Sequence, residues 1–356
     1  MSSDIYLFLK NARGLSPVKS KARVIMNFAD TEKLRRLKSR INQNYKITRL
    51  YAAYLEAYPE LITSEMVEAL TEDGRISREE ALVALLSEIF SLDFEKSEDR
   101  TLIRDYLTPS VRILDVERYR ANPYYKNIKI PNVTDGNWEL RTESYRPYRA
   151  VIAGDMMLGE DCIEIPPLGF FTEEFSFPAV LEGGNEWMTL TPVDLDTCDE
   201  AIEAAHGRVV TFGLGLGYYA YMVSEKAEVE SITVVERSDD VIRLFKKHIL
   251  PQFSHPEKLN IVSADAFEYA REVMPSLGFD VAFVDTWRDA SDGTPMYKRM
   301  KALEHLSPGT KFLYWIENFL ISRIRAENSE RLLSGPAEEK YASFDEALSD
   351  YLGRPI

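Results

Sequence analysis

Three glycines at alternate positions directly follow an apolar run in the second half of the chain. The run Val209 to Phe212 reads as a β-strand and leads into Gly213-Leu214-Gly215-Leu216-Gly217. Because glycine has no Cβ, such a turn can bend tightly and let a ligand touch the backbone. The N-terminus of the helix expected next offers free N–H groups to a carboxylate or phosphate. The alternative is a tight strand-to-helix turn that binds no ligand.

An acidic residue stands at the end of each of the next three predicted strands. Glu236 lies about 20 residues beyond the last glycine, where a carboxylate can accept both ribose hydroxyls of a nucleoside. Asp265 can accept a hydrogen bond from an adenine amino group, and Phe267 is available to cover a ring. Asp285 ends the fourth strand, which should neighbour the first in the usual doubly wound order. We expect these acids near solvent, and together they predict a nucleoside site.

Strands and helices alternate from about residue 200 onward, which would place these acids at one edge of a sheet. The predicted strands are 208–212, 232–236, 259–263, 280–285 and 311–316, and the segments between them are long enough for helices. Such alternation predicts an α/β domain with a Rossmann-like, doubly wound, mostly parallel sheet over residues 201–356.

The chain before this domain divides by pattern into two parts. Residues 1–110 are predicted to form an α-helical N-terminal domain, with Asp30-Thr31 capping one helix and a Ser77/Glu80 capping box opening another. The expected buried face of the first helix is Leu34, Leu37, Ile41, Tyr45 and Thr48.

Residues 111–200 are predicted to form a small β-rich connecting segment. Its strand signals are 150–153, 162–165 and 187–190. The segment Gly183-Gly184-Asn185 reads as a hairpin turn between Ala179-Val180-Leu181 and the strand that begins at Trp187.

The glycine spacing separates this loop from two common nucleotide-binding motifs. The dinucleotide fingerprint G-x-G-x-x-G would need glycine where Tyr218 stands, and the lysine of a P-loop is absent from the sequence that follows the loop. Tyr218 and Tyr219 either wall the ligand pocket or pack the helix on the sheet. Trp187 and Asp194, which precede the first strand, are candidates to close over a cofactor.

With these motifs the chain resembles the class I S-adenosylmethionine-dependent methyltransferase superfamily over about residues 194–317. The motifs are Phe212 to Gly217, Val234-Val235-Glu236, Ala264-Asp265-Ala266 and Phe279 to Asp285. The run Val234 to Ile242 is also similar to the spermidine-synthase-like branch, which uses the same fold with a decarboxylated cofactor.

The resemblance implies a role for each motif. Gly213, Leu214, Gly215 and Gly217 would cradle the methionine part of S-adenosylmethionine, and Glu236 would bind its ribose. Asp265, with Ala266, would bind the adenine amino group. Asp285 would face the acceptor or the amino end of the cofactor.

Two features depart from the superfamily. The chain after Glu317 reads as helix, where an antiparallel strand pair is usual. The sequence Asp285-Thr286-Trp287-Arg288 is neither the Asn-Pro-Pro-Tyr type nor the aspartate–serine neighbourhood of aminopropyl transfer. The resemblance therefore does not identify the acceptor.

We expect a transferase that moves a methyl group from S-adenosylmethionine to a small-molecule or peptide acceptor. Asp285 is the first candidate for the base that deprotonates the acceptor, and Glu317 is the second. Their structural alternatives are a helix cap and an ordinary exposed acid. Two other functions stay open: aminopropyl transfer to a polyamine, and a non-catalytic cofactor-binding module whose helical part carries the function.

Composition sets the remaining expectations. The net charge of −15 over 356 residues disfavours general nucleic-acid binding, and the basic stretch 33–46 reads as a solvated helix face. Cys162 and Cys198 form no CxxC or Cys/His cluster, so no metal site is predicted. The sequence lacks a run of about 18 apolar residues. We therefore expect a cytoplasmic protein without membrane contact, and a homodimer is left open.

Overall fold

The computed structural model describes residues 26–159, 161–334 and 340–353. The chain divides into two compact units, Ser39–Glu327 and the pair Met1–Lys38 with Asn328–Ile356. Helices α2 (Phe28–Ala57) and α14 (Glu317–Leu333) each run from one unit into the other. The smaller unit also contains α15 (Phe344–Leu352). The domain boundaries expected near residues 110 and 200 stay a prediction.

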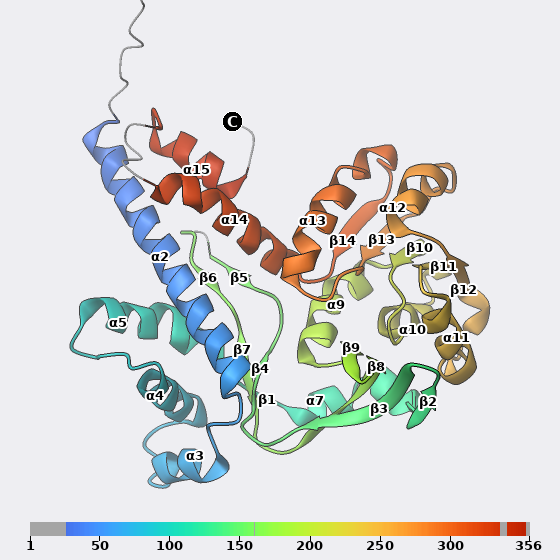
Figure 1. Cartoon of the computed structure of the whole chain (residues 1–356), viewed down its shortest axis with the longest axis horizontal. Helices are drawn as coiled ribbons and strands as arrows, with labels where there is room; N and C mark the ends of the chain where they lie inside the picture. The colour runs from blue at the N-terminus through green and yellow to red at the C-terminus, as the bar shows by residue number, and fades with distance from the viewer. Residues whose placement is uncertain (1–25, 160, 335–339, 354–356) are drawn as a thin grey trace, which may run out of the picture. The chain divides into compact units, whose positions relative to one another are not determined.

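The larger unit contains the predicted Rossmann-like parallel sheet (Figure 1). Its strands are β10 (Gly207–Phe212), β11 (Val229–Glu236), β12 (Leu259–Ser263), β13 (Val281–Val284) and β14 (Lys311–Tyr314). They are all parallel, in the order β12-β11-β10-β13-β14. The order reverses at β10, which confirms that the strand ending before Asp285 lies beside the strand of the glycine loop.

Helices connect these strands, as parallel pairing requires. They are α10 (Tyr218–Ser224), α11 (Asp239–His248), α12 (Ala266–Glu268) with its π-helical continuation Tyr269–Val273, and α13 (Ala290–Lys301). Among the described residues no strand follows β14, and α14 confirms the helix predicted after Glu317. The central strands are buried on both faces: in β10 and β13 the side chains of Val209, Val210, Phe212, Val281, Ala282, Phe283 and Val284 are at most 1% exposed.

A four-stranded antiparallel sheet precedes the parallel one and shares its core. It has the order β2 (Val133–Asp135), β3 (Trp138–Tyr145), β8 (Phe175–Glu182) and β9 (Asn185–Thr189). Gly183 and Gly184 join β8 to β9 with φ values of 59° and 80°, which confirms the predicted hairpin turn. Buried residues of β3 and β8 belong to the same hydrophobic cluster as β10 and β13. This shared core brings β9 to the carboxyl edge of the parallel sheet.

The smaller β elements and the helical part form a second hydrophobic cluster. It combines the sheet β1 (Val111–Leu114), β7 (Leu168–Phe171) and β4 (Ala150–Ile152) with helices α3 (Ser64–Thr71), α4 (Arg78–Ile89) and α5 (Ser97–Leu102). The strand expected at 162–165 is limited to β6 (Glu164–Ile165), which pairs with β5 (Met157–Leu158), because Cys162 takes a positive φ of 63°.

Two helix starts test the capping predictions. Ser77 Oγ accepts from Glu80 N at 3.1 Å, and Glu80 Oε2 accepts from Ser77 N at 2.7 Å, which confirms the capping box of α4. The cap predicted at Asp30-Thr31 is wrong, since α2 already begins at Phe28 and Asn27 Oδ1 accepts from Asp30 N at 2.9 Å.

The buried face of α2 also differs from the predicted one. Leu34, Leu37 and Ile41 are buried as expected, but Asn44 and Ile47 replace Tyr45 and Thr48. The buried stripe continues with the three-residue step of a helix, so that Asn44 enters the core. There Asn44 Oδ1 accepts from Tyr106 Oη at 2.9 Å and from Glu164 N at 3.2 Å.

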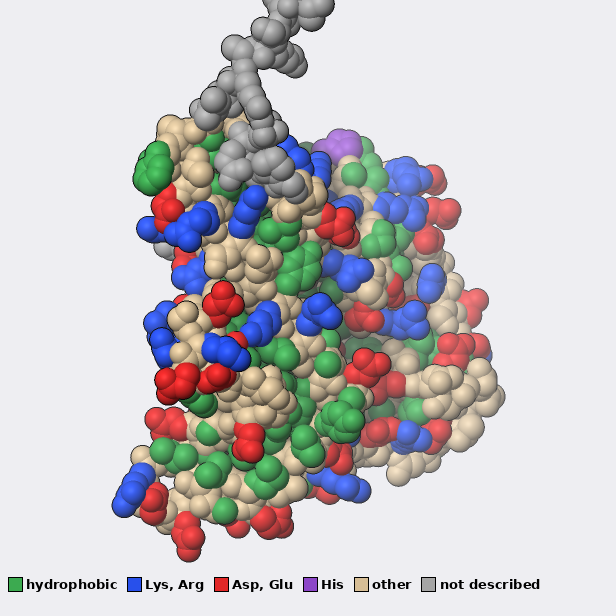
Figure 2. Space-filling model, turned by 60° about the vertical axis from the view of Figure 1, so that its left-hand side comes forward, with side chains coloured by type: hydrophobic (Ala, Val, Ile, Leu, Met, Phe, Trp, Pro, Cys, Tyr) green, Lys and Arg blue, Asp and Glu red, His purple; other side chains and the backbone are tan. Residues whose placement is uncertain are grey.

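Basic and acidic side chains are interspersed on the face shown in Figure 2. Within the stretch 33–46, Arg35 pairs with Glu32 at 2.7 Å, and Lys46 pairs with Asp99 at 2.6 Å. These pairings agree with a solvated helix face. No described helix is long and apolar enough to cross a membrane.

Candidate functional site

The glycine loop leaves the end of β10 and touches the loop after β13. Gly213 N donates to Val235 O at 2.9 Å, and the residue has a φ of 100°. A Cβ at Gly213 would collide with the backbone carbonyl oxygen of Asp285. Gly213 is therefore required for the close approach of two strand ends, whether or not a ligand binds.

Glu236 holds this loop from the neighbouring strand. Its Oε2 accepts from Leu214 N at 3.1 Å, and its Oε1 accepts from Ser238 N at 2.8 Å. The side chain is only 7% exposed, so the expectation that Glu236 lies near solvent is wrong. A carboxylate has about four acceptor directions, and two are used here. The remaining two leave capacity for further donors.

Asp265 lies at the end of β12 and caps α12. Its Oδ1 accepts from Phe267 N at 2.9 Å and from Glu268 N at 3.0 Å. The second oxygen, Oδ2, has no hydrogen-bond partner among the described residues. Phe267 is 7% exposed, and the Arg299 guanidinium lies 3.9 Å from its ring centroid. One face of this ring is therefore covered by the protein itself, while Ala266 beside it is partly exposed.

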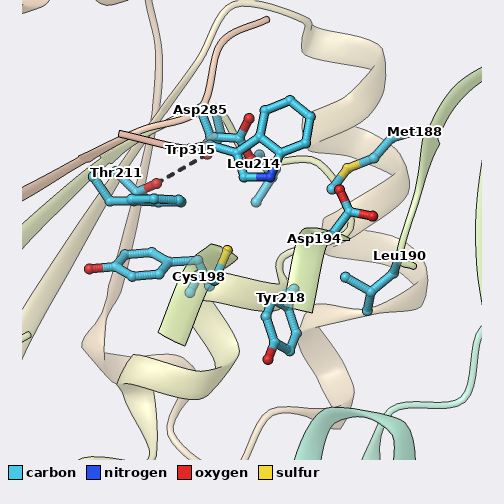
Figure 3. A pocket seen from close by; sticks show the side chains of 13 residues that line it. Met188, Leu190, Asp194, Cys198, Thr211, Leu214, Tyr218, Asp285 and Trp315 are labelled. Carbon is cyan, nitrogen blue, oxygen red and sulfur yellow. Dashed lines mark hydrogen bonds between the residues drawn. The ribbon is translucent and has the colours of Figure 1, made fainter. Parts of the chain in front are cut away.

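A cavity of about 20 Å³ lies between the glycine loop, the ends of β13 and β14, and the segment after β9. A space of this size holds about one water molecule. Figure 3 shows the side chains that line it. Two of them, Asp194 and Cys198, come from α9 (Pro192–Ala204). The residues that the argument uses are Asp194, Cys198, Thr211, Leu214, Asp285 and Trp315.

Met188 of β9 restricts this space. The position that a Cβ on Gly215 would take is filled by the Met188 thioether sulfur. Methionine is unbranched and has three side-chain torsions, so it can leave this position at low cost. A ligand that lies along the glycine loop requires this movement.

The cavity contains two carboxyl groups with different protonation behaviour. Asp194 Oδ2 accepts from Thr191 N at 2.7 Å and from Thr191 Oγ1 at 2.8 Å, and burial raises the pKa of Asp194 to about 6. Burial raises the pKa of Asp285 to about 8, with further contributions from the charges of Asp194 and Glu236. Burial thus favours the protonated form of both acids, and more strongly for Asp285 than for Asp194.

Asp285 and Glu317, the two predicted bases, lie in different surroundings. Asp285 lines the cavity, and its carboxyl group has no hydrogen-bond partner among the described residues. Glu317 Oε1 instead accepts from Tyr297 Oη at 2.6 Å and lies 3.3 Å from Lys301 Nζ. Glu317 is absent from the cavity lining, so the geometry favours Asp285.

A helical segment before the antiparallel sheet fixes the glycine loop from outside. In α8 (Pro123–Asn127), Tyr124 Oη donates to Leu216 O at 2.5 Å, and Tyr125 Oη donates to Leu190 O at 2.6 Å. Asn122 Nδ2, just before α8, donates to Tyr218 Oη at 3.0 Å. The Tyr218 ring therefore walls the cavity while its hydroxyl group is bound elsewhere.

Several residues of the site were not predicted. Helix α9 was not anticipated, although Pro192 at its first turn and the Thr191/Asp194 capping box are recognisable start signals. Cys198 on α9 therefore could not be placed. No pattern in the sequence indicates a role for Trp315. Trp187 packs edge-on against Trp138, with ring centroids 5.4 Å apart, and does not line the cavity.

Among the described residues, no group of three or more His, Cys, Asp or Glu side chains could hold a metal ion.

No protein-family model and no curated protein sequence matches this chain. Among solved structures, it is similar to precorrin 8W decarboxylase from Methanobacterium thermoautotrophicum, with 16% identity, 35% of this chain and 63% of that chain covered, and a TM-score of 0.27. It is also similar to spermidine synthase from Thermotoga maritima, with 18% identity and a TM-score of 0.29. This match covers 43% of this chain and 58% of that chain. The chain thus spans less than two thirds of either structure. TM-scores this low carry no weight for function.

The raised pKa of Asp285 predicts a pH-dependent stability. The folded protein holds this proton more tightly than the unfolded chain, so the free energy of unfolding should fall as pH rises from the ordinary value of 3.8 to about 8. Asp285→Asn should make this fall shallower, and Asp73→Asn at an exposed turn should leave it unchanged. Urea titrations across this pH range measure the effect. A fall of equal slope in wild type and Asp285→Asn would contradict the assignment.

Proposed function

We propose that this protein binds S-adenosylmethionine at the carboxyl edge of its parallel sheet and transfers the methyl group to a small-molecule or peptide acceptor. The observation that carries the proposal is the placement of Glu236, Asp265 and Asp285 at the carboxyl ends of β11, β12 and β13, around a glycine loop at the reversal of strand order. Ligands of doubly wound sheets bind at this reversal point.

The side chains present fit such a cofactor. Glu236 retains two acceptor directions for the ribose hydroxyls, and Asp265 Oδ2 is available to an adenine amino group. The backbone from Gly213 to Gly217 would lie against the methionine part once Met188 has moved. Bound there, the cofactor supplies a methyl carbon on a sulfonium, which is a good leaving group.

The chain's own residues then have three tasks: to align the acceptor, to exclude water and to accept a proton. Asp285 is suited to the last, because burial places its pKa at about 8, close to physiological pH. The rings of Tyr218, Tyr219 and Phe283 line the cavity and provide apolar walls for the second task.

Aminopropyl transfer with decarboxylated S-adenosylmethionine is the second candidate. Its supporting observation is that neither Lys nor Arg is among the described residues that line the cavity, while Asp194 and Asp285 are. A cofactor without a carboxylate would avoid repulsion there, and the net charge of −15 suits a cationic polyamine acceptor. The homodimer and the cytoplasmic location stay predictions.

Cofactor binding tests the proposal directly. In calorimetric titrations we expect S-adenosylmethionine to bind and NAD not to bind. Glu236→Gln removes the charge and one acceptor oxygen, so it should weaken cofactor binding by about 10- to 150-fold, the equivalent of roughly 1.5–3 kcal/mol for a hydrogen bond to a charged group.

The matched control for this test is Glu230→Gln, an exposed acid near the start of the same strand. It should bind the cofactor as wild type does. Tighter binding of NAD than of S-adenosylmethionine would refute the proposal, and wild-type affinity in Glu236→Gln would remove Glu236 from the site.

Turnover tests the role of Asp285. After a metabolite screen has identified an acceptor, Asp285→Asn should lower turnover by about 100-fold or more, the scale of general-base catalysis, while cofactor affinity changes little. In wild type, turnover should rise with pH up to about 8, because only the ionised carboxylate accepts a proton. Release of S-adenosylhomocysteine measures both. Wild-type turnover in Asp285→Asn would shift attention to Glu317.

A further inference from the structure

The indole N–H of Trp315 is a buried donor without an acceptor. Trp315 is 9% exposed and lines the cavity, and its Nε1 has no hydrogen-bond partner among the described residues. In Figure 3 this nitrogen points into the cavity, between Asp194 and Asp285. A buried donor left unsatisfied costs about 1–3 kcal/mol. An acceptor atom of a bound ligand would satisfy this donor.

The backbone next to Trp315 has a strained conformation. Ile316 has a φ of 48°, which is a rare conformation for a β-branched residue and costs on the order of 1–3 kcal/mol. Directly behind it, the Asp155 carboxylate accepts from Asn318 N and from Phe319 N, both at 2.9 Å, and so caps α14. The surrounding structure therefore holds the strained turn after Trp315 in place.

Two hydroxyl donors of the cavity wall are directed elsewhere, whereas the Asp285 carboxyl group, when protonated, offers an O–H within the same cavity. Thr211 Oγ1 donates to Gly213 O at 3.4 Å, and Tyr219 Oη to Ala201 O at 3.4 Å. Burial raises the pKa of the Cys198 thiol well above its ordinary value, so it stays neutral. Trp315 therefore supplies the single side-chain N–H among the described residues that line this cavity.

The loop beside the cavity already accommodates a methionine side chain. The Met188 thioether packs on Gly215, and Figure 3 shows it next to Asp194. An unbranched chain with a sulfur atom therefore fits the loop surface, and its polar end would reach the wall that carries Asp194 and Trp315.

We propose that Trp315 Nε1 donates to the carboxylate of the methionine part of S-adenosylmethionine, while Asp194 faces the ammonium group of the same amino-acid end. This inference rests on the proposed function and adds a residue that selects the carboxylated cofactor. The order of the two pKa values agrees with it, because Asp194 loses its proton at lower pH than Asp285 and is the acid that would carry the charge facing the ammonium group. A single anion matches the ammonium and repels a carboxylate less than two anions would.

Three ligands separate the carboxylate contact from the rest of the cofactor: S-adenosylmethionine, its decarboxylated form, and 5′-methylthioadenosine, which lacks the amino-acid end. Trp315→Phe should weaken the binding of S-adenosylmethionine by about 10- to 150-fold, the range for a hydrogen bond to a charged group. Its affinity for the other two ligands should stay within about twofold, since neither has a carboxylate to lose. Trp315→His, which keeps a ring N–H, should retain most of the wild-type preference for S-adenosylmethionine over its decarboxylated form.

The matched control is Trp287→Phe. Trp287 is 6% exposed, its Nε1 is also unpartnered among the described residues, and it does not line the cavity. The Trp287→Phe variant should bind all three ligands with wild-type affinity. Retained binding of 5′-methylthioadenosine shows that a variant is folded. If Trp315→Phe does not bind 5′-methylthioadenosine, Trp315→His provides the test. A retained preference for the carboxylated cofactor in Trp315→His supports the contact, and loss of this preference overturns it.

Equal weakening of the carboxylated and decarboxylated cofactors in Trp315→Phe, or no weakening of either, would overturn the inference. Failure of wild type to bind any of the three ligands would instead refute the proposed function, and the inference with it.

Discussion

The buried carboxylate of Glu236 joins two loops at the carboxyl edge of the parallel sheet, and the geometry of the site depends on it. One oxygen holds the glycine loop through Leu214 N, and the other holds the turn after β11 through Ser238 N. A carboxylate at 7% exposure is stable there because charge-assisted hydrogen bonds replace its hydration. With the loop fixed in this way, Gly213 can lie against the Asp285 carbonyl, and Leu214 takes its place in the cavity wall.

The second constraint is the core that the antiparallel and parallel sheets share. It brings the β8–β9 hairpin to the glycine loop, so that Met188 covers Gly215 and α9 contributes Asp194 and Cys198 to the cavity. The parallel sheet with Asp285 and the helix that contributes Asp194 thus come from different parts of the sequence. Desolvation by both parts raises the pKa of Asp194 and of Asp285.

Local patterns in the sequence were sufficient to predict the parallel sheet and its central order. An apolar run buried on both faces, such as Val281 to Val284, is recognisable without tertiary information, and so are the Gly183-Gly184 turn and the capping box at Ser77. Those signals arise from contacts close in sequence. The acids at the strand ends were located by the same logic, and their binding roles remain predictions.

The polar surroundings of each side chain could not be predicted, because they depend on residues far apart in sequence. Nothing near Glu236 indicates that Leu214 N would reach it, and nothing near Glu317 indicates that Tyr297 and Lys301 would engage it. The turn that follows Trp315 depends on the conformation of Ile316 and on a cap supplied by Asp155, which is far away in the sequence. The contact of Met188 with Gly215 could not be predicted for the same reason, because the sequence around a strand residue does not indicate which distant glycine it contacts.

A crystal structure of the complex with S-adenosylhomocysteine tests the account most directly. We predict ribose hydroxyls within hydrogen-bond distance of Glu236, which keeps its bond to Leu214 N, and a Met188 side chain that has moved away from Gly215 to make room for the amino-acid end. Ligand bound elsewhere on the chain, or a ribose without contact to Glu236 while Met188 still covers Gly215, would contradict a nucleoside site at this edge of the sheet.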